Sequence, residues 1–339
     1  MAATKKRACA TAQTRRKATP LPVENHFRNE FHCMILDMER RNACDNKKVL
    51  VDTDIGGDID DALCLAYLLG HPSCELMGIT TVSGEVEKRA MIADAICKVA
   101  GRNVPIHAGA DKPLLPSPLY PKPDGAARLS NWAHETAFQK YRAVDFLRQT
   151  IRENPHEISL LAIGQLTNIA LLFLIDPEIP ELIKELHIVC GVFSDELQTS
   201  PDMPMANWNS WADPHACAIV YHTNVPVRRT FGLNVTTRLT LQRREKADLF
   251  STDIMKAVED FGSPWLENNV MTFHDPLAAA CLFEPQICEY QRGFIDVEIK
   301  DERTLGMMHF RPSDDGCGEI ATSVNRNHFF EHYFSIVCR

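Results

Sequence analysis

Short apolar runs alternate with segments of helical periodicity along most of the chain. The runs of strand length lie at 49–51, 75–82, 104–108, 158–163, 186–190 and 225–230. Amphipathic segments with a period near 3.6 lie at 63–70, 87–100, 143–154, 169–175 and 214–221. Regular alternation of this kind is typical of α/β proteins. It predicts a single large domain with a mostly parallel central sheet flanked by helices on both faces.

The remaining segments complete this prediction. Residues 240–283 are expected to be mostly helical, the tail is expected to return to strands near 294–299, and the chain is expected to close on a helix at 326–337. Residues 111–134 are rich in proline, and an irregular insertion of this length is commonly a functional lid. A second loop is expected at 194–204. No internal repeat or linker divides the core.

Charge is distributed unevenly between the start of the chain and the rest. Residues 1–47 contain ten Lys and Arg against five Asp and Glu, so the overall charge of −9 leaves −14 on the remainder. We expect residues 1–46 to form a basic, disordered N-terminal extension and 47–339 to form the catalytic domain. An alternative for residues 1–24 is an organelle transit peptide, because they are basic and hold no acidic residue before Glu24.

Composition excludes several classes of partner and compartment. An acidic body argues against binding nucleic acid. No apolar run reaches the ~18 residues of a membrane span, so no membrane partner is expected. The twelve cysteines form no C-x-x-C pair and no apolar signal sequence precedes them. Thiols scattered in this way indicate a reducing compartment, and we predict a cytoplasmic protein, or an organellar one if the transit peptide is real.

One acidic segment stands out, at residues 52–62, directly after the first predicted strand. It holds five aspartates within ten residues, which would repel one another in a packed core unless a cation lay among them. The alternative is a solvated acidic loop. An EF-hand is excluded because its fifth and twelfth positions would be Gly56 and Leu63. A phosphatase with Asp52 as nucleophile is a weaker alternative, since Gly56 stands where such enzymes have Thr or Val.

The acidic segment resembles the N-terminal signature of the inosine–uridine-type nucleoside hydrolases, with two extra residues between its glycine and its paired aspartates. Further elements similar to that family follow in the family's order: Gly-Gln-Leu-Thr-Asn-Ile-Ala at 164–170, Ala-Asn-Trp-Asn at 206–209, His-Asp-Pro-Leu-Ala at 274–278 and the closing helix at 324–334. The resemblance covers about residues 48–337. It implies the Rossmann-like nucleoside hydrolase fold and cleavage of ribonucleosides to free base and ribose.

The resemblance also implies a set of site residues. It places Ca²⁺ on Asp54, Asp61, Asp275 and the backbone carbonyl of Thr167, all of them hard oxygen donors. It makes Asp54 the base that takes a proton from the attacking water, and His274 the candidate donor to the leaving base. The substrate contacts that it implies are Asp60, Glu85, Asn207, Asn209 and Asp275. A homodimer or homotetramer is implied as well.

Two departures from the family affect the sugar contacts. Glu85 stands where the family usually has Asn, and Asn207 stands where a Glu usually holds the ribose 5′-hydroxyl. The loop at 121–125 lacks the family's His. Donors and acceptors around the ribose are therefore rearranged, and weak activity on common nucleosides is expected. The alternative function is a non-catalytic homologue that binds a ribosylated ligand.

Overall fold

The computed structural model describes residues 46–117, 120–193, 206–246, 248–266 and 270–339. Residues 1–45 and 194–205 lie outside the described part, and with them the predicted extension and the predicted loop at 194–204. From Asn46 to Arg339 the chain forms one compact unit. None of its described helices is both long and apolar enough to cross a membrane.

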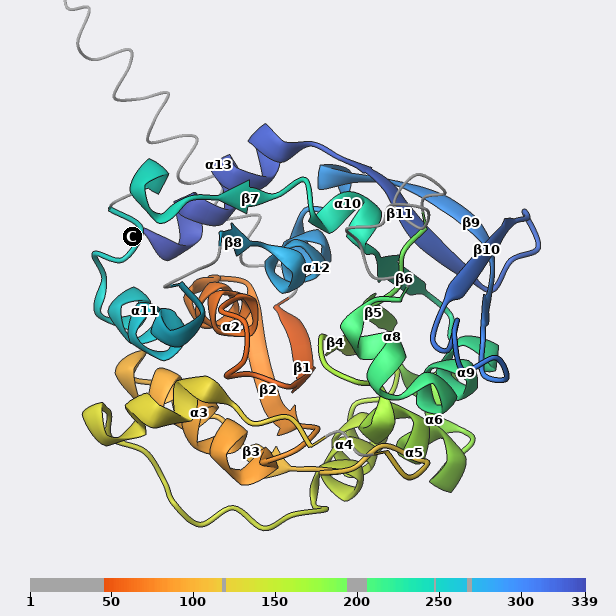
Figure 1. The fold of residues 1–339 in the computed structure, drawn as a ribbon, viewed down its shortest axis with the longest axis horizontal. Coiled ribbons are helices and arrows are strands. Elements are labelled where there is room, and N and C mark those ends of the chain that lie inside the picture. Colours follow the sequence, from red (N-terminus) through yellow and green to blue (C-terminus); the bar gives the residue numbers. More distant parts are fainter. Residues whose placement is uncertain (1–45, 118–119, 194–205, 247, 267–269) are drawn as a thin grey trace, which may run out of the picture. The chain divides into compact units, whose positions relative to one another are not determined.

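The described strands form a nine-stranded sheet in the order β10-β9-β11-β6-β5-β4-β1-β2-β3 (Figure 1). Its parallel part consists of β1 (Lys47–Thr53), β2 (Cys74–Thr81), β3 (Ile106–Ala108), β4 (Ile158–Ala162), β5 (Glu185–Val189) and β6 (Arg228–Phe231). The antiparallel edge consists of β9 (Cys288–Val297), β10 (Met308–Pro312) and β11 (Gly318–Val324), and β11 joins β6 in parallel. The predicted mostly parallel sheet is confirmed.

Helices cover both faces of the sheet (Figure 1). One face carries α2 (Asp60–Gly70), α3 (Val86–Val99), α11 (Asp253–Leu266), α12 (His274–Phe283) and α13 (Arg326–Val337). The other carries α4 (Ala143–Glu153), α5 (Thr167–Ile175), α6 (Ile179–Leu182) and α9 (Pro214–His222). Alternate strand residues point to opposite faces, so Val49 and Val51 join the first core and Leu50 joins the second. All three are buried, as an inner strand covered on both faces requires.

The second half of the chain agrees with the sequence in outline. Most of the described residues in 240–283 are helical, and this range also includes the two-stranded sheet β7 (Thr240–Leu241) with β8 (Met271–Thr272) and the 3₁₀ helix η2 (Arg243–Lys246). The tail returns to strands as expected, and two of its three strands, β10 and β11, lie outside the predicted range of 294–299. Within the predicted lid at 111–134, Asp124–Asn131 forms the 3₁₀ helix η1. Strands of two residues and single 3₁₀ turns are too short to show a period in the sequence.

The order of the strands fixes where a ligand can bind. From β1 the chain builds β2 and β3 on one side and then returns to build β4, β5 and β6 on the other. Loops leaving β1 and β4 therefore diverge to opposite faces of the sheet. In open α/β sheets the crevice at such a point, outside the carboxyl ends of the strands, is the usual ligand site.

Candidate active site

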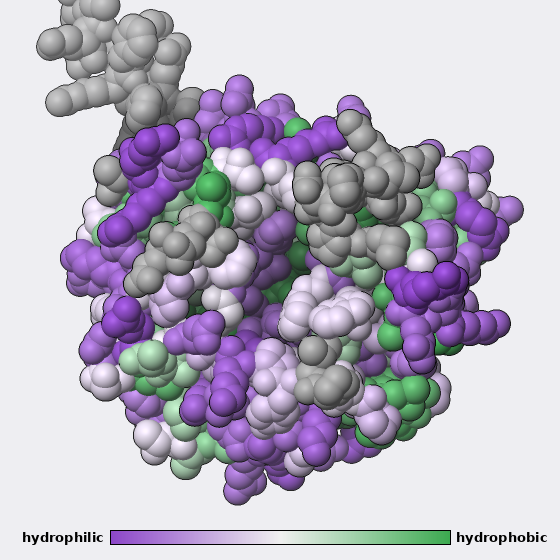
Figure 2. Space-filling model, viewed as in Figure 1, coloured by the Kyte–Doolittle hydropathy of each residue, from purple (hydrophilic) through white to green (hydrophobic). Residues whose placement is uncertain are grey.

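A cavity of about 510 Å³ lies at the carboxyl end of β1. Figure 2 shows a hollow at the centre of this face of the molecule. Of the residues predicted from the sequence, the cavity is lined by Asp54, Asp60, Asp61, Asn207, Asn209, His274 and Asp275. Glu85 and Thr167 are not among its lining residues. Most of the predicted site therefore converges, although its members are separated by more than 200 positions in the sequence.

The turn from β1 into α2 places the aspartates. Gly56 has a φ of +108°, and a Cβ there would lie 2.6 Å from Cδ1 of Ile92 and 2.7 Å from Cβ of Pro123. Thr53 accepts a hydrogen bond from the backbone N–H of Ile55 over 3.1 Å and donates one to the carboxylate of Asp61. The first turn of α2 begins at Asp60, where carboxylates face the positive end of the helix dipole.

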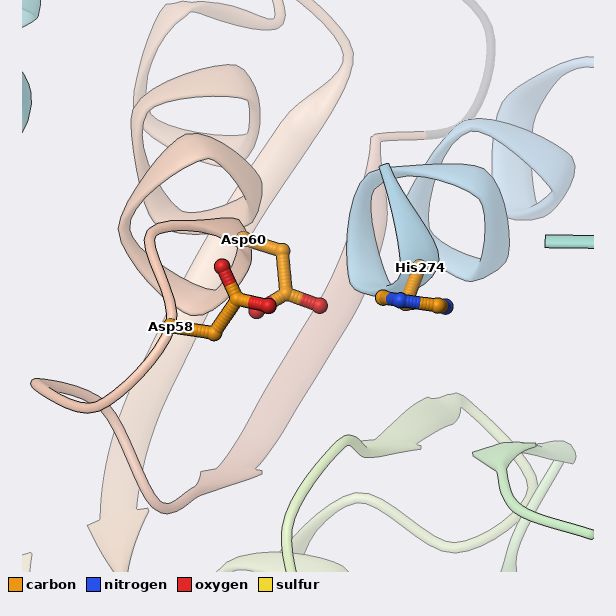
Figure 3. Close-up of side chains that lie close together, drawn as sticks. All are labelled: Asp58, Asp60 and His274. Carbon is orange, nitrogen blue, oxygen red and sulfur yellow. The ribbon is translucent and has the colours of Figure 1, made fainter. Parts of the chain in front are cut away.

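The two extra residues of the acidic segment bring a further carboxylate into the cavity. Asp58 Oδ1 accepts a hydrogen bond from the backbone N–H of Ile59 over 2.5 Å, which holds the carboxylate against the start of α2. Figure 3 shows its carboxylate beside that of Asp60, with His274 across from them. Ligand atoms of these three residues lie within 4.8 Å of one another. Burial raises the pKa of Asp58 to about 7.

A second group of three carboxylates has the properties of a cation site. Oxygens of Asp60, Asp61 and Asp275 lie within 4.8 Å of one another, and all three side chains are buried. Burial, and then repulsion among the aspartates, raises the pKa of each well above its usual range. Buried carboxylates in this arrangement are stabilised by a divalent ion, and the donor set of oxygens suits Ca²⁺. These carboxylates therefore fit a divalent metal, and two of them, Asp61 and Asp275, belong to the ligand set that the resemblance implies.

Asp54, directly after β1, is contacted by the loop that follows β4. Gln165, directly after β4, donates from Nε2 to Oδ2 of Asp54 over 3.1 Å. Burial raises the pKa of Asp54, while Arg89, Gln165 and a hydrogen bond from the Trp208 side chain lower it. Asp52, two residues earlier, accepts from Thr80 over 2.5 Å and is fully buried outside the cavity lining. Asp52 is thus poorly placed for the nucleophilic role of the phosphatase alternative.

Arg89 is a buried cation at this site that was not predicted from the sequence. Its guanidinium donates from Nε to the carbonyl of Ser83 over 2.8 Å and from Nη1 to that of Ile55 over 2.9 Å. Nη1 also contacts the carbonyl of Asp54. Arg89 therefore fixes the β1–α2 turn and lines the cavity. Its position on the apolar face of a predicted helix was a usable signal, because an unpaired arginine is seldom buried.

His274 begins α12, and its Nδ1 lies 2.7 Å from Oγ1 of Thr236. Thr236 belongs to the short helix α10 (Leu233–Thr236). Burial lowers the pKa of His274 to about 4, so the imidazole is neutral at pH 7. If Thr236 donates to Nδ1, the proton of the neutral ring resides on Nε2 and is available to a ligand.

The two asparagines of α8 (Trp208–Ala212) are engaged by the backbone. Asn207 Oδ1 accepts from the N–H of Asn209 over 3.0 Å and so caps the helix. Asn209 Nδ2 donates to the carbonyls of Ile163 and Val189, over 2.8 and 2.9 Å, and joins the ends of β4 and β5. Both still line the cavity.

The other two predicted residues lie at the periphery. The carboxylate of Glu85 accepts two hydrogen bonds from Nζ of Lys88, at 3.0 and 3.1 Å. Thr167 is the first residue of α5, and its Oγ1 donates to Oδ2 of Asp213 over 2.6 Å. Neither contact involves the aspartates of the cavity. Like Arg89, the side chains of Asp58, Gln165 and Trp208 were not predicted to act in the site, because nothing local in the sequence marks which side chains turn inward.

The α/β fold brings buried carboxylates from the β1–α2 turn together with His274 and Asp275 from the start of α12. Comparison with known proteins assigns this arrangement to the nucleoside hydrolase class. The model of the inosine-uridine preferring nucleoside hydrolase family matches residues 49–331, and the chain belongs to this family. The inosine-uridine preferring nucleoside hydrolase of Crithidia fasciculata is 30% identical over 315 residues, which cover 86% of this chain and 96% of that protein.

Solved structures show the same fold. A plant nucleoside hydrolase superposes with a TM-score of 0.73 at 22% identity and covers 87% of this chain and 100% of its own. A purine-preferring ribonucleoside hydrolase from Gardnerella vaginalis gives a TM-score of 0.71 at 23% identity, covering 86% of this chain and 98% of its own. The predicted nucleoside hydrolase fold is confirmed.

Proposed function

We propose that the protein cleaves the N-glycosidic bond of ribonucleosides to free base and ribose with the help of bound Ca²⁺. The observation that supports this most is the meeting of Asp54, Asp60, Asp61 and Asp275 in one cavity that also contains His274. A glycosidic bond breaks through a cation-like sugar, and negative charge beside the ring stabilises such a transition state.

We assign the metal to Asp54, Asp61 and Asp275, which line the cavity. The resemblance adds the backbone carbonyl of Thr167 as a fourth ligand, although Thr167 does not line the cavity. When bound, a divalent ion lowers the pKa of a water molecule and positions it for attack. The cavity holds five carboxylates, those of Asp54, Asp58, Asp60, Asp61 and Asp275, against two cationic side chains, those of Arg89 and Lys122. This excess of negative charge favours a divalent cation.

The chain's own groups would move the protons. Asp54 takes the proton of the attacking water. Burial raises its pKa, which makes it a stronger base, and Arg89, Gln165 and Trp208 offset part of this shift. Asp60 accepts from a sugar hydroxyl at the start of α2. His274 donates from Nε2 to the leaving base, with Nδ1 held by Thr236. Asn207, Asn209 and Asp275 complete the substrate contacts, and Glu85 joins them only by releasing Lys88.

A second candidate function, binding of a ribosylated ligand without turnover, is favoured by one observation. Asn207 Oδ1 is used by the helix cap and Glu85 is paired with Lys88, so both altered sugar positions have other partners. The aspartates that meet in the cavity, Asp54, Asp60, Asp61 and Asp275, favour hydrolysis over binding alone.

The deciding experiment supplies the purified full-length protein and Ca²⁺ with a panel of nucleosides and measures free ribose. Asp54→Asn is the matched control. Ribose released by the wild type, and at least ~100-fold more slowly by the variant, supports hydrolysis. Binding without release by either protein supports the second candidate. Release of phosphate from nucleotides would contradict both.

Three further properties stay predictions. The resemblance implies a homodimer or homotetramer, which light scattering would measure. Composition favours a cytoplasmic location. We place the catalytic domain at 47–339 and treat residues 1–46 as an extension. Removing residues 1–46 should leave the activity unchanged.

A further inference from the structure

A second hollow adjoins the aspartate cavity. Its volume is about 410 Å³, and Trp208 is the residue that lines both spaces. The first cavity alone has the size of a site for a whole small ligand. The second therefore offers room beyond a simple nucleoside.

The walls of the second hollow are formed by two backbone segments that pack closely against each other. One wall is α8, and the other is the turn between β9 and β10, which includes Arg303 and Leu305. Gly306, with a φ of +82°, ends this turn, and a Cβ there would lie 2.7 Å from the carbonyl oxygen of Ser210 and 2.8 Å from Cα of Trp211. Only glycine allows the turn to come this close to α8.

The lining is aromatic and apolar. Trp208 and Trp211 are 44% and 43% exposed, with ring centroids 5.5 Å apart, and Ala206 and Leu305 lie beside them. Two neighbouring indoles with this much exposed surface are uncommon in a packed domain and are typical of ligand sites.

The charges beside the hollow do not favour an anion. Arg303 donates to the carboxylate of Asp301 from both Nε and Nη2, over 3.1 and 2.8 Å. Glu302 adds a further carboxylate to the lining. A phosphate group would meet one cation that is already paired and one negative charge.

The position of the hollow indicates which end of the substrate it faces. His274, the donor to the leaving base in the proposed function, is on α12, whereas Asn207 and Trp208 are at the start of α8 (Figure 1). In the proposed function C1′ lies at the aspartates, Asp60 accepts from the hydroxyl edge of the ribose, and the base is directed to α12, so the remaining end of the ribose is C5′. That end then points to Trp208.

We propose that the hollow between α8 and the β9–β10 turn is a subsite for an uncharged, apolar substituent on C5′ of the riboside. This inference rests on the proposed function for the orientation of the sugar. It extends the substrate class from plain nucleosides to nucleosides with a 5′-alkyl or 5′-alkylthio group. Such a group would pack between Trp208, Trp211 and Leu305.

The test compares kcat/KM for adenosine, 5′-methylthioadenosine and adenosine 5′-phosphate. We expect the methylthio compound to be preferred over adenosine by about tenfold, from burial of its apolar group, and the phosphate to be the poorest. Trp211→Ala should remove the preference, and Thr304→Trp, which fills the hollow from an exposed turn, should do the same if the first variant fails to fold. Leu115→Ala, an exposed apolar residue outside this hollow, should leave the preference intact.

Binding to the Asp54→Asn protein, measured by calorimetry with the same compounds, separates this inference from the proposed function. Tighter binding of the methylthio compound without any hydrolysis by the wild type would contradict the function and support the subsite. If the protein hydrolyses adenosine, three results would overturn the subsite. The methylthio compound could show no advantage over adenosine, its advantage could persist in both Trp211→Ala and Thr304→Trp, or adenosine 5′-phosphate could be the preferred substrate.

Discussion

Gln165 Nε2 donates to Asp54 Oδ2 over 3.1 Å, across the boundary between β4 and β1. This bond links the two loops that leave the sheet in opposite directions. Because Gln165 is 2% exposed, its amide cannot turn away into solvent. The orientation of Asp54 is therefore set by a residue from the neighbouring strand.

Replacing Gln165 by Leu should lower kcat by about tenfold, the scale of one hydrogen bond to a charged group. The bond lowers the pKa of Asp54, so its loss should raise that pKa. A base works only when ionised, and activity is lost as the pH falls through its pKa. The acidic limb of the kcat profile should thus move to higher pH. A lower kcat with an unmoved limb would mean that Gln165 supports only the fold.

The order of elements followed from the sequence because each apolar run is long enough to show its period. The parallel sheet and the closing helix α13 (Arg326–Val337) were obtained in this way. The start of α2 was missed by three residues, since Asp60 and Asp61 interrupt the apolar pattern. They are tolerated in a buried first turn because of the helix dipole and, in our proposal, a cation.

The site was predictable only where its residues form local motifs. Asp54, Asp61 and Asp275 belong to such motifs and meet in the cavity. Arg89 and Gln165 reach the site through tertiary packing, which no spacing along the chain reveals. The roles given to Glu85 and Asn207 depended on alignment alone, and the contacts of these side chains became visible only in the structure.

Calcium should stabilise the protein through Asp61. Removing the ion with a chelator should lower Tm, and Ca²⁺ at about 100 times its Kd should restore about 2.7 kcal/mol. Asp61→Ala should abolish this response. Asp52→Asn is the matched control, because Asp52 lies outside the cavity lining and should keep the response. Zinc, or no metal, in elemental analysis of the purified protein would contradict the assignment.

His274→Ala should impair substrates with poor leaving groups most. The imidazole is neutral at pH 7, since burial lowers its pKa to about 4, and its Nε2–H serves the departing base. Natural nucleosides need that proton, whereas a nitrophenyl riboside does not. We expect a loss of about 100-fold or more for inosine and a small loss for the aryl riboside. Equal losses on the two substrates would exclude His274 as the acid.

His187 should make the fold sensitive to acid. It is fully buried on β5, and burial lowers its pKa to about 4 from an ordinary 6.5. The unfolded chain takes up the proton first, so stability is complete above pH 6.5 and falls as the pH decreases toward 4. The shift corresponds to on the order of 3 kcal/mol. His187→Gln should lose less stability than the wild type between these pH values in urea unfolding. Parallel curves for the two proteins would refute this.

Asn207 provides a test of the sugar contacts that keeps the helix intact. Its Oδ1 caps α8, and Asp is as good a cap as Asn, so Asn207→Asp should preserve Tm. The variant replaces the Nδ2 donor with an acceptor. If that donor meets the 5′-hydroxyl, its loss costs about 1–3 kcal/mol for adenosine and nothing for 5′-deoxyadenosine.

Asn207→Glu should also change the ratio of kcat/KM for these two substrates, but with a weaker helix cap. The measurement is kcat/KM for both substrates in the three proteins. A ratio that stays constant would show that Asn207 serves only the helix, and the alignment of residues 206–209 with the family's sugar-binding element would then be wrong.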